Sequence, residues 1–141
     1  MMNTQYLEII RKIMEEGFGK ARLQLIDQYV GENFIEHQLG AKDGREGLKN
    51  TIIQIHNGLS QLKYVLQRST TEADIIWTHY RATAVQTGEF MNMPPSGKQI
   101  SIDIMDIFRL ENGLLVEHWG IPDRFAAMMQ LGFFQRKETI S

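Results

Sequence analysis

The sequence predicts an α+β fold in which N-terminal helices pack on a curved, mainly antiparallel sheet and enclose a pocket. In the first part of the chain, apolar residues recur at the helical spacings of three and four positions. From Lys63 onward they alternate with a period of two, which is typical of strands. Helices followed by a run of strands indicate an α+β arrangement, and a sheet that curls around a long helix can leave a cavity.

The first segments of the chain predict two helices and a short strand. The first helix ends near Gly17 and Gly19, which interrupt its spacing. Its apolar positions are Tyr6, Ile9, Ile10, Ile13 and Met14. A second, short helix covers about residues 23–30, and a brief strand covers about residues 33–37. A polar turn then leads to the next helix.

The clearest helix follows that turn. Its apolar residues alternate steps of four and three: Leu48, Ile52, Ile55, Leu59 and Leu62. Asp43 and Glu46 resemble a capping box at its start. A last helix begins after Pro122, which suits a first helical position, and ends at Gly132.

Four long strands occupy the second half of the chain. They cover about residues 63–72, 75–87, 98–110 and 114–121. A loop that contains Pro94, Pro95 and Gly97 joins the second of these strands to the third. Asn112 and Gly113 form a tight hairpin turn of the type that requires positive φ angles.

The composition predicts one soluble domain spanning residues 1–141. The length of 141 residues and the 43% hydrophobic content suit a single core. The formal charge is −2 and the basic residues are scattered, so we expect no nucleic-acid partner. No cysteine is present, which excludes disulfides and thiolate chemistry. The start has no signal-peptide pattern and no run reaches ~18 apolar residues, so we expect a cytoplasmic protein without a membrane partner.

Strand parity places Asp106 in an apolar row, because side chains two positions apart share a sheet face. The row contains Ile100, Ile102, Ile104, Asp106, Phe108 and Leu110. Removal from water favours the neutral form of such a carboxyl, which suits a general acid or a hydrogen-bond donor to an oxyanion. The alternatives are a bulge that turns Asp106 outward or a structural pairing with an arginine or a backbone amide. Ile102, Ile104 and Phe108 are candidate residues of the substrate pocket.

His118 is the second candidate in the strands. Parity places Leu114, Val116, His118 and Gly120 on one face of the last strand, and Leu115, Glu117, Trp119 and Ile121 on the other. A histidine has an ordinary pKa near neutrality, so His118 could exchange a proton, although a buried core histidine is the alternative. We expect Asp106 and His118 to face one cavity, with Arg109 and Trp119 pointing away. Trp119 is more typical of packing than of recognition, but it stays among the candidate pocket residues.

Asp123, His37 and His79 complete the candidates. Asp123 begins the last helix, whose N-terminus stabilises its ionised form, so it would act first as a base; ordinary capping is the alternative. His37 ends the short strand and either transfers protons or lies in a surface turn. His79 is a candidate pocket residue that shares a strand face with Arg81, but parity does not say which face.

The sequence lacks the common motifs for metal, nucleotide and serine-hydrolase chemistry. The four histidines form no His-x-x-x-His pair, and the chain has no glycine-rich phosphate loop and no Gly-x-Ser-x-Gly elbow. We therefore expect no metal and no cofactor. The expected partner is a small-molecule ligand in the central cavity.

Several short segments, in this order and spacing, resemble the SnoaL-like polyketide cyclase or ester cyclase family of the nuclear-transport-factor-two-like superfamily. They are Phe34-Ile35-Glu36-His37, Gly44-Arg45-Glu46-Gly47-Leu48, Thr87-Gly88-Glu89-Phe90, Pro95-Ser96-Gly97-Lys98, Asp106-Ile107-Phe108-Arg109-Leu110, Gly113 to Trp119, Asp123 and Gln130-Leu131-Gly132. The resemblance spans about residues 6–132. It departs from the family where Ala84-Val85-Gln86 replaces a common Gly-Thr-His run and where His79 replaces a frequent arginine.

The resemblance implies a cone-shaped α+β barrel and, in well-understood members, a cofactor-free intramolecular aldol cyclisation. An aspartate at the position of Asp123 acts as acid and base in that reaction. The more distant ketosteroid isomerases carry a neutral oxyanion-hole aspartate in the segment that matches residues 104–109, which supports Asp106 in the pocket. The catalytic base of those isomerases is an aspartate at the position of His37. The resemblance therefore does not imply that this chain carries out the isomerase reaction.

Three functions remain open at this point. The first is a cyclase or isomerase-type enzyme that acts on a small, mostly apolar carbonyl compound. The second is a non-catalytic carrier or binding domain, and the third is water addition, as in the epoxide hydrolases of the superfamily. The outer sheet face is expected to include Met105, Ile107, Trp119 and Ile121, which predicts a homodimer or higher homo-oligomer.

Overall fold

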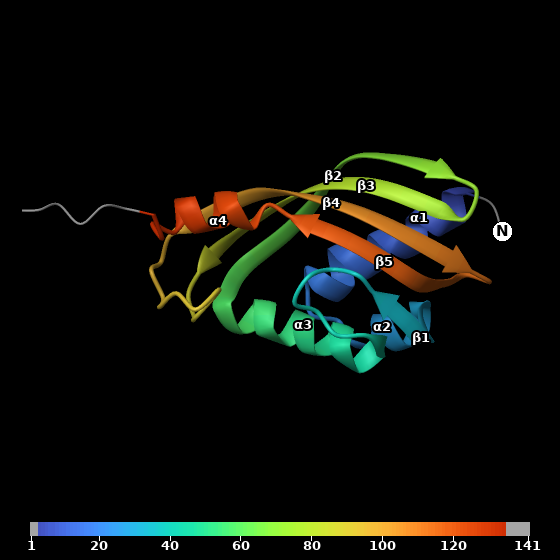
Figure 1. Ribbon diagram of the computed structural model, residues 1–141, viewed down its shortest axis with the longest axis horizontal. Coiled ribbons are helices and arrows are strands. Elements are labelled where there is room, and N and C mark those ends of the chain that lie inside the picture. The colour runs from blue at the N-terminus through green and yellow to red at the C-terminus, as the bar shows by residue number, and fades with distance from the viewer. Residues whose placement is uncertain (1–2, 135–141) are drawn as a thin grey trace, which may run out of the picture.

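A computed structural model describes residues 3–134 and confirms the α+β class. The helices are α1 (Asn3–Arg11), the π-helix η1 (Lys12–Phe18), α2 (Gln24–Tyr29), α3 (Gly44–Gly58) and α4 (Arg124–Gln130). The strands are β1 (Val30–Glu36), β2 (Leu59–Glu72), β3 (Ile75–Gln86), β4 (Gln99–Glu111) and β5 (Leu114–Pro122). Figure 1 shows α2 and α3 on one side of the long strands, with α4 at one end of the sheet.

The five strands form one mixed sheet in the order β1-β5-β4-β3-β2. β2, β3, β4 and β5 are antiparallel neighbours, as expected, and β1 adds a parallel edge against β5. The sheet stays open, because β1 and β2 are edges that do not pair with each other. The core lies between the inner sheet face and the N-terminal helices, where Ile10, Ile13, Tyr80 and Phe108 are fully buried.

The helix that begins after Asp43 is shorter than its apolar spacing predicted. α3 ends at Gly58, and Leu59 and Leu62 lie in β2. The expected capping box is wrong, because the Asp43 side chain makes no bond to the helix N-terminus. Instead, Asp43 Oδ1 accepts a hydrogen bond from the Glu36 backbone amide at 2.7 Å. The carboxylate therefore fixes the end of β1 against the start of α3.

A β-bulge in β5 corrects the predicted faces of its first residues. Arg109 pairs with Glu117, but the next residue of β4, Leu110, pairs with Leu115, so Val116 is the extra residue. Leu115 is consequently buried in the core and Val116 is not. The parity is restored beyond the bulge. The turn before β5 has the predicted positive φ angles, 51° at Asn112 and 78° at Gly113.

Gln86 fixes the long loop between β3 and β4. Its side chain is fully buried on the inner sheet face, where it donates to the Met93 carbonyl at 3.0 Å and accepts from Ser96 Oγ at 2.6 Å. The Gln86 backbone amide also donates to the Lys98 carbonyl, and the Gln86 carbonyl accepts from the Gly97 amide. One buried side-chain amide thus holds the loop at two points, at Met93 and at Ser96.

We predict that Gln86→Leu lowers the free energy of unfolding by about 1–3 kcal/mol, because it removes the two side-chain hydrogen bonds that hold the loop to the end of β3. Chemical denaturation measures this change. The matched control is Gln99→Leu at the exposed start of β4, where we expect a change within about 0.5 kcal/mol. Equal effects at the two positions would show that the hydrogen bonds of Gln86 do not matter.

The outer sheet face carries exposed apolar side chains. Trp77, Met105 and Ile121 are 47%, 51% and 74% exposed, and Ile107 and Trp119 beside them are half-buried. Exposed apolar patches of this kind usually mark an interface. Within the described residues, no helix combines the length and the apolar character needed to cross a membrane. We propose that the outer sheet face, with Trp77, Met105 and Ile121, packs against a second copy of the chain.

The corresponding prediction is a molecular mass in solution of at least twice the 16.3 kDa of one chain. Light scattering over the micromolar range measures it. Met105→Glu should lower the mass toward one chain, because it buries a charge at the interface. Ile53→Glu, at an exposed position of α3, should not. A single-chain mass for the unmodified protein contradicts the proposal.

Candidate functional site

A cavity of about 640 Å³ lies between the inner sheet face, η1, α3 and the loop before β4. Most of its lining is apolar and includes Met14, Phe18, Phe34, Ile102, Ile104 and Phe108. The polar groups that line it include Glu36, Gln38, Asp106, His118 and Arg124. An apolar cavity with a few convergent polar groups is the usual form of a small-molecule site.

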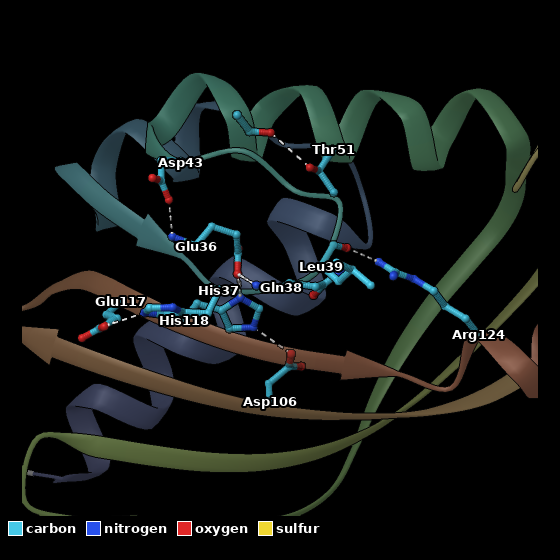
Figure 2. A network of polar contacts seen from close by, with 11 residues as sticks. Glu36, His37, Gln38, Leu39, Asp43, Thr51, Asp106, Glu117, His118 and Arg124 are labelled. Atoms are coloured by element: carbon cyan, nitrogen blue, oxygen red, sulfur yellow. Dashed lines mark hydrogen bonds and ion pairs between the residues drawn. The ribbon is translucent and has the colours of Figure 1, made fainter.

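Three of these polar groups form a buried chain of hydrogen bonds (Figure 2). His118 Nε2 lies 2.7 Å from Asp106 Oδ1, and His118 Nδ1 lies 2.7 Å and 3.0 Å from the two carboxylate oxygens of Glu36. The side chains of Glu36, Asp106 and His118 are only 3%, 2% and 9% exposed. We call this set the Glu36–His118–Asp106 relay.

The sheet topology explains why these three residues meet. β5 lies between β1 and β4, and Glu36 stands directly opposite His118 across the parallel ladder. Asp106 stands opposite Gly120, two residues along β5 from His118, so the His118 ring leans along its strand to reach it. A Cβ on Gly120 would lie 2.6 Å from His118 Cε1 and 2.8 Å from Asp106 Oδ1, so only glycine leaves room. The Phe108 ring stacks on His118 with centroids 4.9 Å apart.

The relay determines the charge of His118. Burial alone lowers the pKa of His118, but the hydrogen bonds and charges of Asp106 and Glu36 outweigh burial and raise it from 6.5 to about 9. Below that pKa both ring nitrogens of His118 carry a proton, so the ring can donate to Asp106 and to Glu36 at once. His118 is therefore an imidazolium at neutral pH.

One oxygen of the relay has no partner within the described residues. Asp106 Oδ2 is buried and accepts no hydrogen bond from them, in contrast to Oδ1. Thr78 Oγ1, directly across the β3–β4 ladder from Asp106, is buried in the same unpaired state. Unpaired buried oxygens are costly and concentrate where a site serves catalysis or a ligand. Asp106 thus keeps one unpaired carboxylate oxygen beside the positively charged His118 ring.

The structure brings together five of the residues that the sequence selected. Asp106, His118, Ile102, Ile104 and Phe108 all line the cavity. They share the inner face of β4 and β5, and the bulge at the start of β5 does not change this, since it lies before His118. The outward bulge that was the alternative for Asp106 does not occur.

The other four candidates lie outside the cavity lining. The His37 side chain points away from the relay. Its Nε2 lies 2.6 Å from Glu117 Oε2, and its ring stacks on Trp119 with centroids 4.7 Å apart. His79 lies on the outer sheet face and bonds Asp103 at 2.7 Å. Trp119 occupies an outward position of β5, as strand parity requires.

Asp123 is exposed at the N-terminus of α4. Its Oδ1 accepts a hydrogen bond from the Ala126 amide at 3.0 Å, which is the ordinary capping geometry. The neighbouring residues Pro122 and Arg124 line the cavity, whereas Asp123 does not. The structure therefore separates the residue that the family resemblance selected from the relay.

Glu36 is the site residue that sequence reasoning missed. The sequence predicts a brief strand in this segment, but residue type alone singles out His37. Parity offers a usable signal, because Glu36 lies two positions after Phe34, which is 2% exposed. The parallel pairing of β1 with β5, which turns that face toward His118, has no sequence signature. Among the described residues, no group of three or more His, Asp or Glu side chains is arranged to hold a metal ion.

Comparisons with known proteins agree with this architecture. TsrD from Streptomyces laurentii is 20% identical with a TM-score of 0.86, over 94% of this chain and 98% of that chain. Wild-type IdmH from Streptomyces antibioticus is 24% identical with a TM-score of 0.81, over 91% and 99%. A SnoaL-like polyketide cyclase from Agrobacterium tumefaciens is 16% identical with a TM-score of 0.74, over 94% and 100%. At these identities the likeness shows the fold alone.

A family model carries the assignment further. The model of the SnoaL-like polyketide cyclases matches residues 8–131, which is most of the chain. None of the curated proteins matches the sequence significantly. The helices packed on an open, mixed sheet agree with the fold of the nuclear-transport-factor-two-like superfamily. This chain belongs to the SnoaL-like polyketide cyclase family.

Proposed function

We propose that the protein is a cyclase or isomerase-type enzyme that uses cofactor-free acid and base chemistry on a small, mostly apolar carbonyl compound. The observation that carries this proposal is the free Asp106 oxygen, buried at an apolar cavity beside the His118 imidazolium. Family membership supports the same general class of reaction. The apolar lining suits a substrate that is mainly hydrocarbon with a few oxygen atoms.

The first step is removal of a proton from the carbon next to the substrate carbonyl. Asp106 Oδ2 takes the proton, and the C–H bonding electrons pass into an enolate. The positive charge of His118 offsets the negative charge that moves from Asp106 to the enolate. Glu36 holds the imidazolium in place from its other side, with contacts of 2.7 Å and 3.0 Å. A buried, preorganised charge acts more strongly than the same charge in water.

The second step returns the proton. In an aldol cyclisation, the enolate carbon attacks a second carbonyl of the same molecule, and the resulting alkoxide takes the proton from Asp106. In an isomerisation, the proton returns to another carbon of the enolate. Asp106 ends as a carboxylate in both cases, so the cycle needs no cofactor and no net change in protons. In this scheme Asp106 acts as the base rather than as the neutral acid that its apolar row suggested, and it takes the role that the family resemblance gave to Asp123.

The test measures hydrogen–deuterium exchange at the α-carbon of 2-tetralone in D₂O by NMR, because this exchange requires only the first step. We predict that Asp106→Asn lowers the enzyme-catalysed exchange rate by about 10²-fold or more, since the amide keeps the shape but loses the basicity. Asp103→Asn is the matched control, because Asp103 lies in the same strand but pairs with His79 on the outer face. We expect this control to change the rate less than about threefold.

Asp123→Asn separates this assignment from the one that the resemblance implies. Asparagine also caps a helix, so α4 should persist. Loss of exchange in Asp123→Asn with full activity in Asp106→Asn contradicts the role of Asp106. A protein that binds 2-tetralone but exchanges it no faster than buffer does would be a carrier domain.

The relay also predicts a pH dependence. The pKa of folded His118 lies near 9, above its ordinary 6.5, so its contribution to stability is complete below about pH 6.5, and the imidazolium is lost as the pH rises through 9. The exchange rate should fall to about half near pH 9, and NMR of the His118 ring should give the same midpoint. Glu36→Gln removes one carboxylate, so the midpoint should move to lower pH. A His118 midpoint of 6.5 in the unmodified protein contradicts the relay.

A further inference from the structure

Residues 37–43 form a loop that passes over one end of the cavity. Gln38 and Ala41 line the cavity, while Leu39 between them is 81% exposed. The loop is closed at its base by the bond from the Glu36 amide to Asp43 Oδ1. Figure 2 shows it between the end of β1 and α3, with Leu39 next to Arg124. We call this loop the strap.

Besides the His37 backbone amide, which donates to the His118 carbonyl at 2.9 Å, two hydrogen bonds hold the strap against the site. On the inside, the Gln38 backbone amide donates to Glu36 Oε1 at 3.0 Å, which is the same oxygen that lies 2.7 Å from His118 Nδ1. On the outside, Arg124 Nη2 donates to the Leu39 carbonyl at 2.8 Å. Arg124 is the first residue of α4 and also lines the cavity. One end of the relay and one cavity wall are therefore both bonded to the strap.

The strap places the Gln38 side chain at the relay. A Cβ on Gly120 would clash with Gln38 Oε1, and the same Cβ position lies close to His118 and Asp106. The Gln38 amide thus lies over Gly120, beside the pair that holds the free Asp106 oxygen. An amide can donate to one ligand oxygen and accept from another. No other strap residue that lines the cavity has a polar side chain.

The strap is fixed at His37 and at Lys42, whose backbone packs on Gly47 of α3, but it has few contacts between these two residues. Gly40 and Gly44 have φ angles of 85° and 81°, and a Cβ added at either glycine would meet no atom within 4 Å. Ala41 makes one backbone bond, to the Gln38 carbonyl at 3.1 Å. Gly40 within the strap and Gly44 just after it allow the backbone rotation that a hinge requires.

We propose that residues 37–43 close over a bound ligand, that Arg124 is the positioning residue that latches them shut, and that Gln38 contacts the ligand. This inference rests on the proposed function for the ligand contact alone. Opening breaks the Arg124–Leu39 bond and withdraws Gln38 from the relay. Closing restores both and covers the cavity while the ligand is bound.

Amide hydrogen exchange tests the latch without any ligand. In Arg124→Ala, exchange of the strap amides, including Gln38 and Ala41, should be about tenfold faster, because a charge-assisted hydrogen bond is lost. Arg124→Lys keeps a cationic donor and should recover part of this protection. The matched control is Gln130→Ala, which removes the two bonds of α4 to Ser101 but leaves the latch.

Binding of 2-naphthol, followed by fluorescence, tests closure and the ligand contact. Arg124→Ala should release 2-naphthol several-fold faster, as expected when a lid opens more often. Gln38→Ala should weaken binding by about fivefold while exchange of the amides at 39–43 stays within about twofold of the unmodified protein. That combination separates a lost ligand contact from a loosened strap.

If amide hydrogen exchange in the strap is unchanged in Arg124→Ala, the latch is overturned. This holds even if the unmodified protein catalyses hydrogen–deuterium exchange of 2-tetralone as proposed. The latch is also overturned if amide hydrogen exchange rises equally in the strap, α4 and the sheet, since Arg124 would then stabilise the whole fold. Normal naphthol binding in Gln38→Ala overturns the ligand contact. Absence of 2-tetralone exchange together with a tenfold effect on the strap leaves the latch standing and removes the proposed enzyme function.

Discussion

The buried contact of His118 with two carboxylates is the constraint around which this end of the molecule is built. An imidazolium among apolar side chains is costly unless its hydrogen bonds and charge are matched, and Glu36 and Asp106 match both. Each comes from a different neighbouring strand, so the relay also requires β1 to pair with β5 in parallel. Gly120 leaves the space, and the stacked Phe108 ring holds the imidazole in position. β1, a short edge strand, thereby supplies Glu36 to the site.

Much of this architecture follows from local patterns. The period of two in β4 placed Asp106 on the same face as Ile104 and Phe108, and the cavity lining has that composition. The turn chemistry of Asn112 and Gly113 located the hairpin, because few residues tolerate positive φ angles. His118 was placed correctly although the bulge at Val116 reverses parity earlier in its strand. These elements could be predicted since each depends on residues close together in the chain.

The remaining features depend on contacts between distant segments. Glu36 and His118 are 82 residues apart, and no local pattern indicates which strand lies beside β1. Asp43 had the sequence of a capping residue, but the nearby Glu36 amide competes for its carboxylate. On the outer surface, His37 bonds the Glu117 carboxylate and His79 bonds the Asp103 carboxylate. Residue type alone could not separate these surface pairs from the relay, because all three consist of histidine and acid.

The difference between the surface pairs and the relay lies in burial and in the count of charges. On the surface, Asp103 and Glu117 each also bond an arginine, so the negative charge is compensated and screened by water. The relay holds one imidazolium between two carboxyl groups, and no lysine or arginine within residues 3–134 forms an ion pair with Asp106 or Glu36. Asp106 Oδ2 is left buried and unpaired, which is unfavourable for stability. Apolar side chains that filled this space would make the fold more stable, so an incompletely paired carboxylate at this position argues that the relay serves a ligand rather than the fold.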